Sequence, residues 1–403
     1  MDYDHVDFMK LCVKNYKELT KVDKLKKVST PFMDDSLKSF IDNDSKPGIL
    51  SKVACSVLMQ VLYGARTARF DLLKVVQGLA AKVSKWTLAC DHELFQLMSY
   101  IDTTADVKMS GYIGDLPKDL KIRIYADADF ASDADAKSVS GVFEVLVGPN
   151  TWFPLHARSS KQGSVAHCTP VAEIVAIDTA IQKTGIPAMD LWNTVLQRTV
   201  EIEYMEDNAA CALIITTGKN PSLRHVLRTQ KVDIKWLHEV FQKHKNLTMT
   251  LTPTKEQSAD IFTKRFKSPR EWLWACYNIG IDLSECLGSQ VMLKSLIADS
   301  LLPKVTKSMK KAAAEAAAGG ACAPPPSVPN GAPLRIERRK GKSGHCMFCC
   351  THNYENNGGI QDGRYGAVTD GGIKYKYISP TTNHISASSS HIDPLIGVRS
   401  SPQ

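Results

Sequence analysis

The sequence predicts an α/β fold in which a five-stranded sheet is flanked by helices, with a small helical unit before it and a disordered tail after it. Three observations lead to this prediction. Apolar residues recur at helical spacing up to residue 118, and from Leu120 they alternate with polar residues as in half-buried strands. Strand-like and helix-like runs then follow one another as far as residue 268. Near Lys310 the chain becomes rich in Ala, Gly and Pro, which is typical of a linker.

These changes divide the chain into five segments. A poorly defined N-terminal segment (1–45) precedes the helical unit (46–118), and the α/β domain follows (119–268). A helical extension (269–305) leads into a disordered or low-complexity tail (306–403). The chain is therefore long enough for a folded enzyme domain with a helical unit attached to it.

Charge and composition narrow the class of protein and its partners. The net charge of +8 and the pI near 8.8 favour a polyanionic partner, with nucleic acid as the first candidate. The acidic start lacks a secretory signal, and no run of 18 apolar residues occurs, so we expect no membrane segment. The 11 cysteines show no disulfide framework and suit a reducing compartment. We expect an intracellular protein, cytoplasmic or nuclear, that is not secreted.

The helical unit is predicted to contain three helices. The first carries apolar residues at helical spacing from Ala54 to Leu62. Asp71 is expected to lead the second helix, and Asp91 to cap the third.

Three strands joined by short turns open the α/β domain. The first begins at Leu120, and runs over 141–147 and 151–157 supply the second and third as an antiparallel meander. Pro154 would interrupt the hydrogen bonds of the third strand unless it lies at an edge or a bulge. If the site is inactive, the sequence therefore indicates damage to this third strand as the cause.

Helices and two further strands complete the predicted domain. Thr169 and Pro170 suit the N-cap and the first position of a helix. Asn208 precedes another helix and suits its N-cap, whereas Thr254 and Gln257 have the spacing of a capping box at the start of the last helix. The remaining elements are a strand over 200–205, a helix over 232–243 and a strand over 247–251.

Four acidic residues lie where the ends of these elements could meet: Asp127, Glu173, Asp207 and Asp260. Phosphodiester hydrolysis by two metal ions needs several carboxylate oxygens at one point, so that cations about 3.5–4 Å apart can hold the attacking and leaving oxygens. Mg²⁺ prefers such hard oxygen ligands. Taken singly, each residue is equally consistent with a solvated surface carboxylate.

Motifs across the domain resemble the ribonuclease H domain of copia-type retrotransposon polyproteins. The start of the domain is similar in Y-A-D-A-D-F-A-S-D (125–133) and K-S-V-S-G (137–141). Later landmarks follow in the expected order: S-S-K-Q (159–162), T-P-V-A-E (169–173), M-E-D-N (205–208), L-R-H (223–225) and Q-S-A-D-I-F-T-K (257–264). Upstream, V-L-M-Q-V-L-Y-G-A-R-T-A-R-F-D-L-L (57–73) resembles the connection between the polymerase and the ribonuclease H of those polyproteins. The resemblance covers about residues 28 to 266.

This resemblance implies a ribonuclease H-like five-stranded mixed sheet and an endonuclease that hydrolyses the RNA strand of RNA/DNA hybrids. Its catalytic and metal-binding residues would be Asp127, Glu173, Asp207 and Asp260. Its cofactors would be two Mg²⁺ ions, with Mn²⁺ as an alternative, and no small-molecule substrate is expected. The rest of a retrotransposon polymerase is a candidate partner. Lys137, Arg158, Lys161 and Asn208 are candidate nucleic-acid contacts, for which surface or capping roles remain alternatives.

Three other classes of protein are alternatives to an active ribonuclease H. A catalytically inactive retroelement relic would keep the fold and at most bind nucleic acid. An integrase or transposase is disfavoured because such enzymes place their glutamate last, and the Phe32-Met33-Asp34-Asp35 string has too little chain before it for a polymerase. Asp129 competes with Asp127, and the choice between them follows the family pattern.

The tail contains one motif with metal-binding chemistry. Its cysteines Cys346, Cys349 and Cys350 lie beside His345 and His352. Because a second Cys pair is missing, the sequence favours a tail without zinc.

Overall fold

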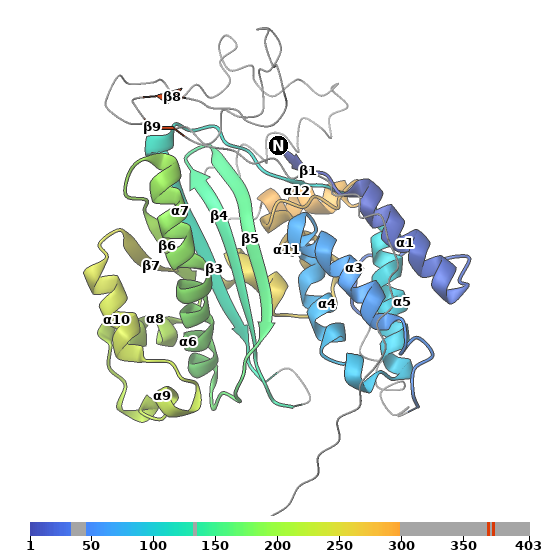
Figure 1. Cartoon of the computed structure of the whole chain (residues 1–403), viewed down its shortest axis with the longest axis horizontal. Helices are drawn as coiled ribbons and strands as arrows, with labels where there is room; N and C mark the ends of the chain where they lie inside the picture. Colours follow the sequence, from blue (N-terminus) through green and yellow to red (C-terminus); the bar gives the residue numbers. More distant parts are fainter. Residues whose placement is uncertain (34–45, 132–134, 299–368, 371–372, 375–403) are drawn as a thin grey trace, which may run out of the picture. The chain divides into compact units, whose positions relative to one another are not determined.

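The computed structural model in Figure 1 describes residues 1–33, 46–131, 135–298, 369–370 and 373–374. The chain divides into two compact units, Met1–Ser327 and Val328–Gln403. In the second unit the described residues form two short antiparallel strands, β8 (Thr369–Asp370) and β9 (Ile373–Lys374). Among the described residues, no helix is long and apolar enough to cross a membrane.

Several predictions fall where the structure is not described. The expected disordered tail lies outside the described residues apart from β8 and β9, and so do the cysteine cluster at 345–352 and Asp34 and Asp35. The boundaries of the five segments predicted from the sequence remain predictions. The N-terminal segment, for which the sequence predicted no element, carries helix α1 (Val6–Thr20) and strand β1 (Asp2–Tyr3), which pairs with β2 (Met109–Ser110).

A mixed five-stranded sheet forms the centre of the α/β domain, as predicted. Its strands in chain order are β3 (Lys121–Asp129), β4 (Val139–Gly148), β5 (Thr151–Lys161), β6 (Ile202–Glu206) and β7 (Leu247–Leu251). In space the order is β5-β4-β3-β6-β7. The first three strands pair antiparallel, whereas β6 runs parallel to β3, and β7 parallel to β6.

One face of the sheet packs against the helices that follow the meander. Ile122, Ile124 and Ala126 point from β3 into a core shared with these helices, because alternate side chains of a strand lie on one face. The helices of this face are α6 (Thr169–Ala180), α7 (Ile186–Leu196), α8 (Ala209–Thr217) and α10 (Ile234–Lys243), seen beside the sheet in Figure 1. A short helix, α9 (Val226–Thr229), lies between α8 and α10 in the chain.

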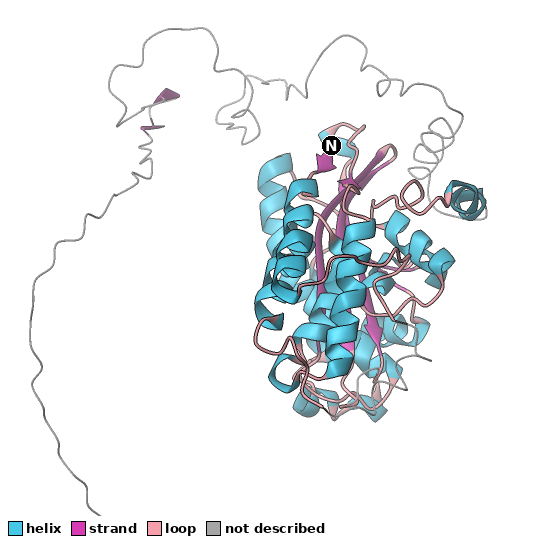
Figure 2. Ribbon diagram, turned by 90° about the vertical axis from the view of Figure 1, so that its right-hand side faces the viewer, coloured by secondary structure: helices cyan, strands magenta, loops and turns pink. Residues whose placement is uncertain are grey.

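The opposite face of the sheet packs against the helical unit. Tyr125 and Phe143 point into a second core, which also contains side chains of the preceding helices and of the C-terminal extension. These helices are α1, α3 (Ala54–Thr67), α4 (Leu73–Ala80), α5 (Leu88–Thr103), α11 (Pro269–Asn278) and α12 (Gln290–Ala298). In Figure 2 the helices of this side lie in front of the strands. Helices on both faces leave the sheet with its two edges and the ends of its strands as accessible borders.

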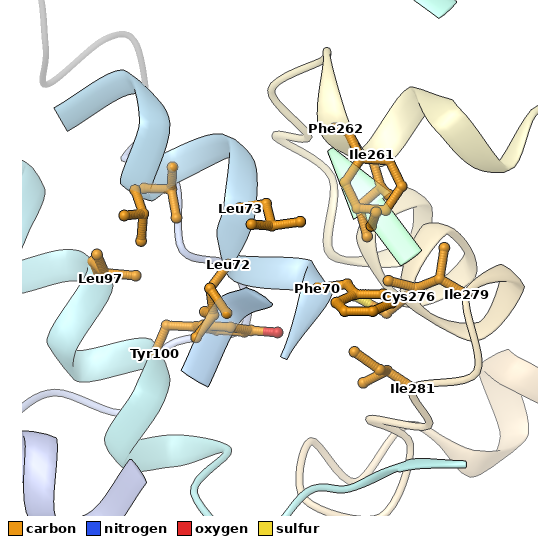
Figure 3. Close-up of a cluster of buried hydrophobic side chains, with 14 of the residues drawn as sticks. Phe70, Leu72, Leu73, Leu97, Tyr100, Ile261, Phe262, Cys276, Ile279 and Ile281 are labelled. Atoms are coloured by element: carbon orange, nitrogen blue, oxygen red, sulfur yellow. The ribbon is translucent and has the colours of Figure 1, made fainter. Parts of the chain in front are cut away.

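The second core joins segments that are far apart in the sequence. Figure 3 shows Leu72 and Tyr100 of the helical unit close to Cys276, Ile279 and Ile281 from the C-terminal extension. All five residues are fully buried, at 0% exposure. The C-terminal extension therefore fills the space between the helical unit and the sheet, because burial of apolar side chains drives such packing.

Two acidic residues of the helical unit have other roles than the predicted helix starts. Asp71 lies in a short 3-10 turn (Phe70–Leu72), and Leu72 precedes α4. Asp91 lies in the first turn of α5, where it accepts hydrogen bonds from the backbone N–H groups of Ile49 and Leu50. Both carboxylates satisfy tertiary partners, which a helix-start pattern in the sequence cannot distinguish from capping.

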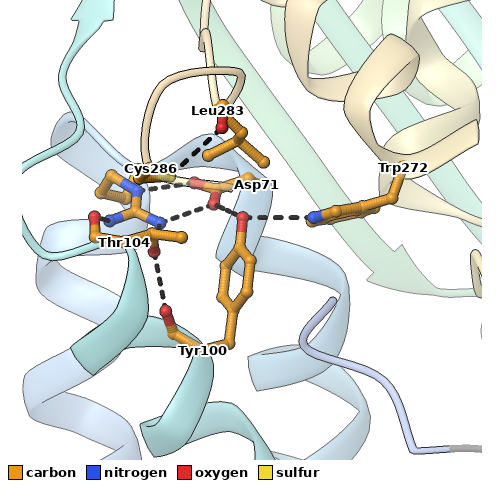
Figure 4. A network of polar contacts seen from close by, with 7 residues as sticks. Asp71, Tyr100, Thr104, Trp272, Leu283 and Cys286 are labelled. Carbon is orange, nitrogen blue, oxygen red and sulfur yellow. Dashed lines mark hydrogen bonds and ion pairs between the residues drawn. The ribbon is translucent and has the colours of Figure 1, made fainter. Parts of the chain in front are cut away.

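Asp71 belongs to a buried polar network (Figure 4). Its carboxylate accepts two hydrogen bonds from Arg69, at 2.9 and 2.8 Å, and a third from the Tyr100 hydroxyl at 2.8 Å. Arg69 also donates to the backbone carbonyl and the hydroxyl of Thr104, and the Trp272 indole N–H donates to Tyr100. Arg69 is 1% exposed and Asp71 0% exposed, so the network is a fully desolvated ion pair with its hydrogen bonds satisfied.

Two predicted helix starts in the α/β domain were wrong in detail. Cys168, with no side-chain cap, precedes α6, so that Thr169 is already helical. Thr254 begins a 3-10 turn (Thr254–Glu256) instead of the last α-helix, and Gln257 is extended. Gln257 caps a second 3-10 turn, η7 (Ser258–Phe262), by accepting a hydrogen bond from the Ala259 N–H. The capping-box residues thus mark an irregular segment, which packs on the sheet.

The helix after the meander continues further than predicted. A π-helical turn (Ile181–Gly185) joins α6 directly to α7, which the sequence did not predict. The Tyr204 hydroxyl of β6 lies where a Cβ at Gly185 would be, so only glycine fits this close approach.

Pro154 lies both on an edge strand and beside a β-bulge, the two situations in which a strand tolerates proline. β5 is the edge strand of the sheet, and the pairing of β4 with β5 shifts between Glu144 and Val145, which pair with His156 and Pro154. The extra residue on β5 is Leu155, as in a β-bulge. The strand continues to Lys161, so the expected damage to this strand does not occur.

Glu144 should make the stability of the protein depend on pH. It lies on β4, is 7% exposed, and accepts a hydrogen bond from the Trp192 indole, and burial raises its pKa to about 7. Because the folded state holds the proton more tightly, stability should fall as pH rises from the unfolded pKa of 4.5 to about 7. Glu144→Gln should therefore exceed the parent in free energy of unfolding by up to about 3 kcal/mol at pH 8.

Urea denaturation of both proteins from pH 4 to pH 8 tests this expectation. The difference between them should close as the pH approaches 4.5. Glu201→Gln, at an exposed position just before β6, is the control and should follow the pH dependence of the parent. A pH-independent difference for Glu144→Gln would contradict the assigned titration.

Candidate active site

Parallel pairing of β3 with β6 brings Asp127 and Asp207 to the same end of the sheet. Tyr125 pairs with Met205, and each aspartate lies two residues further along the chain, Asp127 within β3 and Asp207 just after the end of β6. Asp127 is 2% exposed and points, like Tyr125, to the face covered by the helical unit. The carboxyl ends of parallel strands meet at one edge, and this rule places the two carboxylates together.

Turn η7 brings Asp260 to this end of the sheet. Gln257 donates from Nε2 to the Ala126 carbonyl of β3 at 2.9 Å, and Ser159 of β5 donates to the Phe262 carbonyl at 2.6 Å. These hydrogen bonds attach the turn to β3 and β5. Asp260 is thereby held beside Asp127.

Helix α6 brings Glu173 to the site from the other face. Gln162, directly after β5, donates from Nε2 to the Ser140 hydroxyl and to the Ala172 carbonyl, both at 2.9 Å. This side chain thus ties the start of α6 to β4, and Glu173 lies in the first turns of the helix, 4% exposed.

The four predicted acids come together in two groups that share one member. Carboxylate oxygens of Asp127, Asp207 and Asp260 lie within 4.8 Å of one another, and so do those of Glu173, Glu206 and Asp207. Asp129, the competing aspartate of β3, belongs to neither group and is half-exposed. Asp207 belongs to both groups, and the catalytic and metal-binding roles of the four acids remain predictions.

Two residues that sequence reasoning missed contact the first group. The Thr263 hydroxyl donates a hydrogen bond to Asp127 Oδ2. Lys264 Nζ lies 2.7 Å from Asp260 Oδ1 and 3.7 Å from Asp127 Oδ1. Thr263 and Lys264 are the last two residues of the Q-S-A-D-I-F-T-K string (257–264). Their place in this motif, next to Asp260, was the available sequence signal that they lie near the site.

Glu206 is the third residue that the sequence reasoning missed. It is 0% exposed and ends β6 in the same phase as the buried residues Ile202 and Tyr204. Ile202, Tyr204 and Glu206 occupy every second position of β6, so the alternation of the strand points all three side chains to the same buried face. This alternation could have indicated that Glu206 is a buried carboxylate.

Burial raises the pKa of four carboxylates in the two groups, those of Asp127, Glu173, Glu206 and Asp260. Burial, followed by repulsion from Asp127 and Glu206, raises the pKa of Glu173 to about 10. Burial and nearby carboxylates likewise raise the pKa of Asp260 to about 8 and that of Glu206 to about 8. Burial also raises the pKa of Asp127, against the opposing effect of Lys264. Excess negative charge in a buried place is therefore the main electrostatic feature of the site.

This donor set fits divalent cations. Every ligand atom is a carboxylate oxygen, the type that Mg²⁺ and Mn²⁺ prefer. Among the described residues, Glu173 Oε2 and Glu206 Oε2 are buried side-chain oxygens with no hydrogen-bond partner. Buried polar atoms without partners are rare in folded proteins, and a bound ion is one of the recognised reasons for them.

The candidate nucleic-acid contacts lie at the same end of the sheet. Lys137 precedes β4 and Lys161 ends β5, opposite the residues of β3 that follow Asp127. Lys161 forms an ion pair with Asp135 at 2.9 Å, and Arg158 is exposed on β5. Asn208 caps α8, because its Oδ1 accepts the Cys211 N–H at 3.0 Å. Their contacts with nucleic acid remain predictions.

Gly141 should be essential for the position of η7. Gly141 lies on β4 and pairs with Asp127 of β3. A Cβ at Gly141 would lie 2.8 Å from the Ala259 carbonyl oxygen and 2.7 Å from Thr263 Cγ2. Gly141→Ala should therefore push η7 off the sheet and lower the free energy of unfolding by about 1–3 kcal/mol. Thermal unfolding of the variant measures this loss.

Gly163→Ala is the matched control, because a Cβ there meets nothing within 4 Å. This variant should unfold at nearly the temperature of the parent. Equal stability of the two variants would show that η7 is not packed on β4 as described.

Comparisons with solved structures give matches that each cover 36% of the chain. LC11-RNase H1, isolated from compost by a metagenomic approach, is 20% identical, and the match covers 36% of this chain and 92% of that chain with a TM-score of 0.25. The RNase H domain of PFV is 17% identical over the same shares, 36% and 92%, with a TM-score of 0.26. The Prototype Foamy Virus protease-reverse transcriptase is 17% identical over 36% of this chain and 19% of its own, with a TM-score of 0.23.

No protein-family model and no curated protein matches the chain. At these identities and TM-scores the structural matches assign no residue and no activity. The site is defined by the positions of this chain's own side chains.

Proposed function

We propose that the chain is a metal-dependent ribonuclease H, which hydrolyses the RNA strand of RNA/DNA hybrids. The observation that carries this proposal is that Asp127, Glu173 and Asp260, from β3, α6 and η7, each have a carboxylate oxygen within 4.8 Å of a carboxylate oxygen of Asp207, which directly follows β6. Such a constellation suits phosphodiester hydrolysis with bound divalent cations.

The acidic residues would hold the cations, Mg²⁺ or alternatively Mn²⁺. When bound, the cations supply an activated water and stabilise the oxygen that leaves the RNA phosphate. Asp207, which belongs to both groups, would contact both cation positions. Thr263 and Gln257 orient Asp127 and η7 through the hydrogen bonds described above.

Lys264 would change its partners when cations are bound. Its ammonium group lies beside Asp127 and Asp260, and these two carboxylates raise the pKa of Lys264 although burial opposes the shift. Lys264 therefore compensates part of the negative charge of the first group. Its side chain is 38% exposed, so that it can turn outward toward a phosphate group of the substrate.

Recognition of the hybrid would depend on backbone shape, phosphates and RNA 2′-hydroxyls. Lys137, Arg158 and Lys161 are the proposed phosphate contacts, because they lie at the end of the sheet that carries the acids. A chain with few such contacts binds its substrate weakly and with strong dependence on salt. We therefore propose that the rest of a copia-type retrotransposon polymerase is the partner that adds affinity.

A cleavage assay tests the proposed function. The purified chain is incubated with a labelled RNA/DNA hybrid in Mg²⁺, and Asp207→Asn is the control. We expect Mg²⁺-dependent cleavage of the RNA strand by the parent and none by the variant. Cleavage no greater than that of Asp207→Asn would reject the enzyme and favour the inactive relic, provided that both proteins are folded by circular dichroism.

A further inference from the structure

Glu206 occupies a position where a carboxylate is costly unless it has a partner. Residues Ile202 and Tyr204 precede it on the same face of β6, and all three side chains are at most 1% exposed. The face belongs to the core beneath α6 and α8. Burial of an unpaired carboxylate at such a place is strongly unfavourable.

The local structure holds the Glu206 carboxylate in a fixed orientation. Its Oε1 accepts the backbone N–H of Asn208 at 2.9 Å, and Asn208 itself caps α8. The Cys211 thiol of α8 also interacts with the carboxylate. Within the described part of the chain, Oε2 has no hydrogen-bond partner.

Of the two acidic neighbours of Glu206, Glu173 also has a buried carboxylate oxygen without a hydrogen-bond partner in the described structure. Carboxylate oxygens of Glu206, Glu173 and Asp207 lie within 4.8 Å of one another. Glu173 is 4% exposed, and its Oε2 is also buried without a partner. The ammonium group of Lys264 forms its ion pairs with Asp127 and Asp260, which belong to the first group and not to the group of Glu206. Two buried oxygens without partners thus converge beside a third carboxylate.

We propose that Glu206 is a fifth metal ligand, which completes a divalent-cation site with Glu173 and Asp207 beside the site formed by Asp127, Asp207 and Asp260. This inference rests on the proposed function and adds to it a ligand outside the four predicted acids. A cation among these oxygens would satisfy Glu173 Oε2 and Glu206 Oε2, which nothing else in the described structure does. Three carboxylates suit Mg²⁺ or Mn²⁺.

Calorimetric titration of the full chain with Mn²⁺, without nucleic acid, tests the proposal. Mn²⁺ is chosen because the thiols of the chain prefer softer metals. We expect two Mn²⁺ ions per parent chain and one per Glu206→Gln chain. Asp260→Asn should lose the other ion and retain the one at Glu206. Glu201→Gln, an exposed neighbour on the same segment, should bind two ions like the parent.

Glu206→Asp covers the case in which Glu206→Gln fails to fold. It keeps the charge but withdraws the carboxylate by one methylene group, and it should weaken one of the two sites tenfold or more. Two ions with unchanged affinities in either folded variant would overturn the proposal, as would fewer than two ions in the parent. Because no hybrid is present, the result is independent of cleavage: an inactive chain that loses one ion in Glu206→Gln would refute the nuclease alone.

Discussion

Asp127→Asn should lower the rate of Mg²⁺-dependent hybrid cleavage roughly 1000-fold, which corresponds to about 4 kcal/mol of transition-state stabilisation. Asp127 is the most deeply buried acid of the first group, and its carboxylate is fixed by Thr263 and by its position on β3. An amide keeps the shape of the side chain but removes the charge that a divalent cation requires. Single-turnover cleavage of a labelled hybrid measures the loss.

Asp129→Asn is the matched control for this prediction. Asp129 lies two residues further on the same strand, half-exposed and outside both carboxylate groups. Its replacement should change the cleavage rate by less than a factor of about 3, since exposed substitutions rarely alter a site. Equal losses of cleavage rate in both variants would contradict the choice of Asp127 over Asp129. A larger loss in Asp129→Asn would assign the catalytic role to Asp129 instead.

Asp71→Ala should lower the free energy of unfolding by about 3–5 kcal/mol, because it leaves the buried Arg69 guanidinium without its charge partner. The pair is at most 1% exposed, and the hydrogen bonds of Tyr100 and Trp272 link it to α5 and α11. Loss of the carboxylate should therefore weaken the contact of the helical unit with the C-terminal extension. Urea denaturation followed by tryptophan fluorescence measures the effect.

The double variant Arg69→Met/Asp71→Leu separates the ion pair from simple packing. Apolar side chains of similar size can replace a buried ion pair with little loss or with a gain in stability. We expect the double variant to recover most of the stability that Asp71→Ala loses. A loss below about 1 kcal/mol in Asp71→Ala would show that the pair is solvated.

The regular part of the fold was predictable from residue patterns. Alternation at Ile122, Ile124 and Ala126 fixed a strand with one buried face, and short turns fixed the meander. Parallel pairing of β6 with β3 did not follow from local patterns, because it depends on contacts across about 80 residues, and the family resemblance implied only a mixed sheet. Caps failed where a polar residue had a tertiary partner, as Asp71 and Gln257 do.

The candidate site was predictable in its acids and less so in their surroundings. The motifs identified the four carboxylates that the structure brings together, although their role in catalysis is still a prediction. Glu206 was visible only as an acidic residue in the buried phase of β6, which the motif reading ignored. The Q-S-A-D-I-F-T-K string places Thr263 and Lys264 near Asp260, but their contacts with Asp127 span more than 130 residues of chain, and no local pattern predicts those contacts.

Anomalous diffraction from crystals of the full chain soaked in Mn²⁺ tests the central claim most directly, since it locates the cations without reference to activity. We predict anomalous peaks bounded by Asp127, Asp207 and Asp260 and by Glu173, Glu206 and Asp207. Crystals that hold Mn²⁺ elsewhere, or that show no peak at either group under saturating Mn²⁺, would contradict a metal-dependent nuclease site in this chain.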